Sequence, residues 1–94
     1  MEIIDISDFS TCDANNFLNM SVIFKDNLTK TDLCILAEGK LLIHNDIHSI
    51  PYFKIISNDF IIRGSLNTNR ITIEFSSSDQ AVCKNILNTI LHQV

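Results

Sequence analysis

The stretch that decides the fold is NRITIEFSSSDQAVCKNILNTILHQV, residues 69–94, at the end of the chain. Apolar and polar residues alternate over residues 70–75, which predicts a strand. After a run of serines, apolar residues recur at spacings of three and four, as on one face of a helix. The members of this stripe are Val82, Cys83, Ile86, Leu87, Ile90, Leu91 and Val94. We therefore expect a strand that leads into an amphipathic C-terminal helix.

The start of this helix carries capping signals. Ser77 is the predicted N-cap, and Gln80 stands three residues later, which completes the pattern of a capping box. Asp79 falls in the first turn, where the helix dipole favours an acid. We predict no other helix, so the chain should end in its only one.

The chain before residue 69 predicts six further strands, over residues 2–9, 17–25, 33–37, 41–46, 52–56 and 59–64. In the first, Ile4 and Ile6 should face the core, and in the second Leu18, Met20, Val22 and Phe24 should do so. The run LCILA at 33–37 is almost wholly apolar, which predicts a strand paired with 41–46. Gly39 would supply the positive φ of the hairpin between them. Ser57-Asn58 is the expected turn of the next hairpin.

Seven strands followed by one helix predict a mainly β, single-domain protein over residues 1–94 with antiparallel pairing. So small a chain must fold such a sheet over on itself to bury its apolar face. A half-open barrel leaves one end uncovered, which an amphipathic helix can close. The expected fold is therefore a pleckstrin-homology-like half-barrel, seven-stranded and capped by the helix.

Composition narrows the classes of function. The content is 46% hydrophobic and 19% charged, and sixteen isoleucines favour strands. The formal net charge of −4 argues against direct nucleic-acid binding, which relies on basic surfaces. Residues 1–50 carry −5 and residues 51–94 carry +1, so an acidic partner should dock on the second half. No apolar run approaches the roughly 20 residues that span a membrane.

The residues that could hold a metal or a disulfide do not form a recognisable site. The chain has three cysteines, Cys12, Cys34 and Cys83, which is an odd number, and it contains no CxxC motif. We therefore expect free thiols, with Cys34 and Cys83 buried. His44 and His48 have HxxxH spacing, but they fall on a strand and a loop, where they should diverge. We predict no metal and no cofactor.

The chain also lacks the patterns of catalytic and phosphate-binding sites. It contains no GxSxG, GxxxxGK[ST] or GxGxxG, and capping explains the serines at 76–78. We expect no catalytic residue and no enzyme activity. The loop TCDANN at 11–16 has no basic residue, which argues against a phosphoinositide site.

The outward face of the strands at 52–56, 59–64 and 70–75 is the candidate binding site. If Phe53, Ile55, Phe60, Ile62, Ile71, Ile73 and Phe75 face the core, the pleat turns Tyr52, Lys54, Ile56, Ile61, Arg63, Arg70, Thr72 and Glu74 outward. An apolar spot with a basic rim is typical of a protein-docking surface. We predict that a protein partner contacts Lys54, Ile56, Ile61, Arg63, Arg70 and Thr72; the alternative is a solvated face with scattered isoleucines.

The second half of the chain resembles a known family. The run YFKIISNDFIIRG, a polar linker and NRITIEFSSSDQAVCKNILNTIL are similar to the N-terminal domain of the meiotic recombination protein family Rec-one-one-four, called Rec-seven in fission yeasts. Tyr52, Lys54, Ile55, Gly64, Arg70, Phe75, Gln80, Ala81 and Cys83 stand at the positions that carry the resemblance.

The resemblance implies a non-catalytic accessory factor for meiotic DNA double-strand breaks. The N-terminal domain of that family is pleckstrin-homology-like and recruits proteins of the break-forming machinery on chromosomes in the nucleus. DNA binding lies in a separate C-terminal region, so this chain would be the N-terminal fragment of a longer protein, without membrane binding. The alternative is a scaffold domain of the same superfold in another nuclear or cytosolic complex, for transcription, mRNA decapping or ubiquitin recognition.

Overall fold

The chain forms one antiparallel sheet with both helices on the same side of it. The computed structural model describes residues 1–11, 17–45 and 52–92. The strands are β1 (Ile3–Ile6), β2 (Ser10–Thr11), β3 (Leu18–Phe24), β4 (Leu41–Asn45), β5 (Tyr52–Ile56), β6 (Phe60–Ser65) and β7 (Arg70–Phe75); the helices are α1 (Lys30–Leu36) and α2 (Gln80–Leu91).

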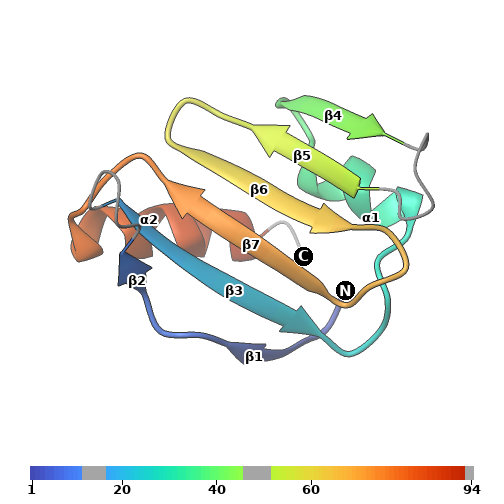
Figure 1. Cartoon of the computed structure of the whole chain (residues 1–94), viewed down its shortest axis with the longest axis horizontal. Coiled ribbons are helices and arrows are strands. Elements are labelled where there is room, and N and C mark those ends of the chain that lie inside the picture. Colours follow the sequence, from blue (N-terminus) through green and yellow to red (C-terminus); the bar gives the residue numbers. More distant parts are fainter. Residues whose placement is uncertain (12–16, 46–51, 93–94) are drawn as a thin grey trace.

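The sheet is open, with β1 and β4 at opposite edges. Its order is β1-β3-β7-β6-β5-β4, and β2 pairs with the start of β3. Every pairing is antiparallel. Figure 1 shows α1 and α2 behind the sheet, so these helices cover one face, and the described residues leave the face toward the viewer open. The predicted fold class, mainly β with a C-terminal helix, is confirmed.

The alternation of side chains in β3, β5, β6 and β7 fixes which face is the core. Burial alternates along β3, β5 and β7, and in β6 from Phe60 to Arg63, as the period of two requires. All the residues that we predicted to face inward from these four strands are buried. The eight predicted outward residues of β5, β6 and β7 are exposed or half-buried.

The C-terminal helix is confirmed, but its cap differs from the prediction. Asp79, not Ser77, is the N-cap, and its Oδ1 accepts from the backbone N–H groups of Ala81 and Val82. Ser77 instead accepts from the backbone N–H of Asp79. Asp is as good a cap as Ser, so the local sequence allowed both. Cys83 and Ile90 are buried against the sheet, whereas Val82 is 43% exposed.

The prediction of a single helix was wrong, because residues 30–36 form α1. Thr29 caps it, and its capping box with Asp32 satisfies backbone N–H groups at both positions. Leu33 and Leu36 point into the core. A short apolar run such as LCILA has the same composition in a buried strand and in a buried helix, which is why periodicity misassigned it. Gly39 does have a positive φ of 72°, but it turns the chain from α1 into β4.

The N-terminal segment also departs from the expected strand. Its register shifts between Ile3 and Asp5, so the alternation slips by one residue. Ile3 therefore packs against the core, whereas Ile4 is 61% exposed and Ile6 is 38% exposed, contrary to the prediction. The segment that follows, expected to be a loop, begins with β2.

Gly64 allows a close approach inside the sheet. It lies directly opposite Phe53 in the β5–β6 register. A Cβ at Gly64 would lie 2.8 Å from Phe53 Cζ and 3.2 Å from the backbone oxygen of Arg70. The Phe53 ring is fully buried and occupies the space that a side chain at Gly64 would need.

Candidate functional site

On the open face, residues that lie opposite each other in neighbouring strands form two rows of side chains, and each row runs across the strands. In the first row, Leu41 lies opposite Ile56, Ile56 opposite Ile61, and Ile61 opposite Glu74. We call Leu41, Ile56 and Ile61 the apolar row. Because directly opposed Cβ atoms are about 5 Å apart, these three side chains form a continuous strip over β4, β5 and β6.

The second row lies two residues further along each strand, about 7 Å away. Lys54 lies opposite Ile43 on β4 and Arg63 on β6, and Arg63 lies opposite Thr72 on β7. We call Lys54 and Arg63 the basic pair. The two like charges face each other in neighbouring strands, an arrangement that is unfavourable in isolation and that a bound anion would relieve.

Fixed partners hold two of the three predicted basic residues. Arg63 Nε lies 3.2 Å from Glu74 Oε1, and both side chains are about half exposed. Arg70 Nη2 donates to Ser21 Oγ at 3.0 Å, at the far end of β7 from Ile61. Lys54 makes no ion pair with any described residue. The outward residues of β5–β7 include three basic groups and one acid, +2 in sum, on a chain of −4.

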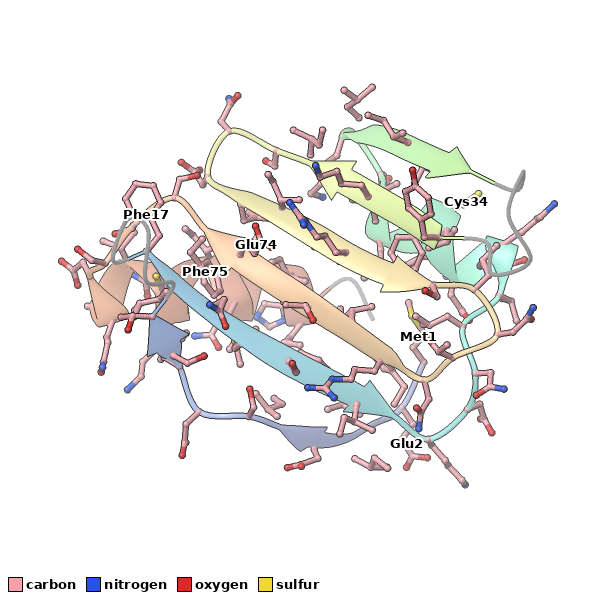
Figure 2. All side chains as sticks on the ribbon, in the orientation of Figure 1. Met1, Glu2, Phe17, Cys34, Glu74 and Phe75 are labelled. Atoms are coloured by element: carbon pink, nitrogen blue, oxygen red, sulfur yellow. The ribbon has the colours of Figure 1, made fainter. Side chains whose placement is uncertain are left out.

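Two hollows flank these rows. One of about 370 Å³ lies over β5–β7 and is lined by Tyr52, Phe53, Lys54, Arg63, Gly64, Ser65 and Thr72. A second of about 300 Å³ lies between Phe17, Ile61 and Glu74, with Leu18, Asn19, Phe75 and Ser76. Figure 2 shows Phe17 at the same end of β7 as Glu74 and Phe75. Five of the six predicted contact residues thus line a hollow or join the apolar row, and Arg70 lies apart from them.

The sequence did not identify three further residues of this surface. Leu41 and Ile43 are 58% and 44% exposed, and they extend the apolar surface onto β4. Residues 41–43 are all apolar, so the sequence pattern did not show which of their side chains face outward. Phe17 is 40% exposed beside Ile61, and nothing in its local sequence indicates a position so far along the chain from β6.

The thiols divide into one buried and one exposed group. Cys83 is fully buried, as predicted; burial and the nearby Asp79 carboxylate raise the pKa of its thiol. Cys34 is exposed on α1, so the prediction that it is buried was wrong. Cys12 and His48 lie outside the described residues, as do loop residues 12–16.

The remaining site classes give no candidate in the described part of the chain. Residues 1–11, 17–45 and 52–92 contain no group of three or more His, Cys, Asp or Glu side chains that could hold a metal ion. Neither of the described helices is long and apolar enough to cross a membrane.

Comparison of the chain with protein-family models, with curated proteins and with solved structures gave no match. The open face with its apolar row and basic pair is the candidate binding surface in the described part of the chain.

Proposed function

We propose that this chain is a non-catalytic protein-interaction module that docks a partner on its open sheet face. The supporting observation is the apolar row of Leu41, Ile56 and Ile61 lying beside the basic pair on a face that neither helix covers. Apolar anchors with a charged rim are the usual composition of a docking surface.

The chemistry of the surface specifies the chemistry of the partner. Apolar side chains of the partner would cover Ile56 and Ile61, and its carboxylates would face Lys54 and Arg63. The charge of +2 on the outward residues of β5–β7, on a chain of −4, favours an acidic segment over a basic one. Thr72 lines the hollow over β5–β7, where its hydroxyl can take part in hydrogen bonds to such a segment.

The wider proposal is that the open sheet and α2 form a pleckstrin-homology-like half-barrel of the Rec-one-one-four family. The resemblance in residues 52–91 supports it, and several of its residues have specific places in the fold. Phe75 and Cys83 are buried, and Gly64 accommodates Phe53. In this proposal the partner belongs to the machinery that forms meiotic DNA breaks in the nucleus, and this domain contacts neither DNA nor membrane.

The identity of the captured partner tests this proposal. The immobilised domain is incubated with extract from meiotic cells, and bound proteins are quantified by mass spectrometry against Ile61→Glu. Enrichment of break-forming proteins by the wild type alone supports the family. Enrichment of transcription, decapping or ubiquitin-system proteins instead contradicts the family and supports the alternative scaffold. Pelleting of the domain with phosphoinositide vesicles would contradict the assignment as a protein-docking module without membrane binding.

A further inference from the structure

The two edges of the sheet differ in how they are protected against pairing with another strand. At the β1 edge, the register shift and the acids Glu2 and Asp5 discourage further pairing. At the other edge, β4 has the sequence LLIHN, with no bulge in its register, no proline and no Asp, Glu, Lys or Arg. None of the described strands pairs with its outer side.

The hydrogen-bond pattern identifies which backbone groups β4 presents at this edge. Ser57 N donates to Phe60 O at 3.0 Å, so these residues form a hydrogen-bonded pair that closes the β5–β6 hairpin. Alternation then directs the polar groups of Ile56 and Lys54 toward β4, where Leu41 and Ile43 oppose them. The N–H and C=O groups of Leu42 and His44 consequently point outward.

We propose that β4 pairs with β4 of a second copy of this chain, antiparallel and about a two-fold axis at Ile43. This register places Leu42 opposite His44 of the second copy, so both pairs of outward backbone groups find partners. Centring the axis on Leu42 would instead pair His44 with Lys40, whose N–H already donates to Ala37 O. The inference goes beyond the proposed docking function and does not depend on it.

Side chains favour a second copy as the occupant. On the open face, Ile43 meets Ile43 of the second copy, so two exposed apolar side chains cover each other. On the covered face, a hollow of about 140 Å³ beside Leu42, lined also by Leu33, Cys34, Leu66 and Lys30, leaves room for side chains of an added strand.

Charge does not oppose this pairing. The two Lys54 residues would be separated by three strand spacings, about 14 Å. That distance exceeds the Debye length of about 8–10 Å at physiological salt, so their repulsion is screened. A corresponding pairing of two β1 strands would instead bring the acids of both copies together. The dimer would carry two open faces side by side on one continuous sheet.

Sedimentation of the purified domain at increasing concentration tests the inference. A single strand pair should bury less area than a standard interface, which covers about 1,200–2,000 Å², so we expect a weak dimer that forms between about 10 µM and 1 mM. Val82→Glu, a charge added on α2, should dimerise like the wild type. A wild-type domain that stays monomeric throughout this range overturns the proposal, even if it binds an extended peptide of another protein.

Charge pairs at residue 43 then identify the interface. Ile43→Glu and Ile43→Lys should each be monomeric at 1 mM, because two like charges meet at the axis. An equimolar mixture of the two should recover the dimer, which a merely misfolded variant would not do. A dimer of either variant alone would contradict pairing through β4. So would the absence of a dimer in the mixture, provided that both variants have the circular dichroism of the wild type.

Discussion

Arg63 and Glu74 form an ion pair across β6 and β7, with Nε 3.2 Å from Oε1. Their register is diagonal, since Arg63 lies opposite Thr72 and Glu74 opposite Ile61. Glu74 is the one acid among the described outward residues of β5–β7. It pairs with Arg63, the cation that we propose binds a carboxylate of the partner. The pair therefore opposes binding of an acidic segment, because the segment must displace Glu74 to reach Arg63.

Removal of this internal competitor should strengthen binding. Glu74→Gln leaves Arg63 without its carboxylate partner, and we expect the affinity for the partner to rise about two- to fivefold, since exposed ion pairs contribute about 1 kcal/mol or less. Titration calorimetry with the captured partner measures this change. Urea unfolding should show stability within about 1 kcal/mol of the wild type. A loss of affinity in Glu74→Gln would mean that Glu74 itself contacts the partner.

Reversal of either charge in the basic pair should weaken binding. Lys54→Glu and Arg63→Glu each replace a cation that faces the partner's carboxylates, and we expect a loss of at least tenfold in affinity, largest at low salt. Lys84→Glu on α2 is the matched control, because it makes the same change of charge behind the sheet. An equal loss in all three variants would indicate a response to net charge and not to this surface.

The close approach at Gly64 predicts a sensitive position for stability. In Gly64→Ala the new Cβ would meet the buried Phe53 ring and the backbone oxygen of Arg70, neither of which can move freely. We expect a loss of about 1–3 kcal/mol in the free energy of unfolding, measured in urea. Gly39→Ala is the comparison: its φ of 72° strains a side chain, but no described atom lies within 4 Å of the added Cβ. A neutral Gly64→Ala would contradict the packing of Phe53 over β6.

The cap of α2 can be tested directly against the sequence-based assignment. Asp79→Ala removes an acceptor from two backbone N–H groups, and we expect it to lower stability by about 1 kcal/mol. Ser77→Ala removes one hydrogen bond before the helix and should have the smaller effect. A larger loss of stability in Ser77→Ala than in Asp79→Ala, measured by urea unfolding, would indicate that Ser77 is the N-cap.

The buried thiol predicts a loss of stability at alkaline pH. Burial raises the pKa of Cys83 above its ordinary value of 9.0, so at higher pH the thiol ionises in the unfolded chain before it does in the folded one. The stability that is fully present below pH 9 is therefore lost as the pH rises toward the folded pKa. Wild type and Cys34→Ala should show this loss as the pH rises above 9.0, and Cys83→Ala should show less of it. Equal loss in all three would exclude Cys83 as the cause.

The sheet could be predicted from the sequence because β3, β5, β6 and β7 each bury one face only. The alternation of apolar and polar residues then predicts which side chains face the core and which face outward. It therefore predicts Ile61 and Arg63 on the open face. The same argument failed where the pattern has no period. LCILA is apolar throughout, and only the Thr29–Asp32 capping box indicated a helix.

The outward positions of the candidate surface could be predicted for the same reason. Alternation with core residues placed Lys54, Ile56, Ile61, Arg63 and Thr72 on the open face. It could not show that Arg63 is paired with Glu74, since a diagonal contact depends on register between strands. It also could not place Phe17 beside Ile61, because the two are brought together only by the pairing of β3 with β7 and of β7 with β6.

The affinity of the captured partner for Ile61→Glu, compared with wild type and Val82→Glu, tests the central claim most directly. Ile61 belongs to the apolar row and also lines the hollow beside Phe17, whereas Val82 lies on α2, behind the sheet. Loss of an interface anchor typically reduces affinity by about 2 kcal/mol or more, close to thirtyfold. We predict that loss for Ile61→Glu, with native circular dichroism, and wild-type affinity for Val82→Glu. Wild-type affinity of a folded Ile61→Glu would contradict docking on the open face.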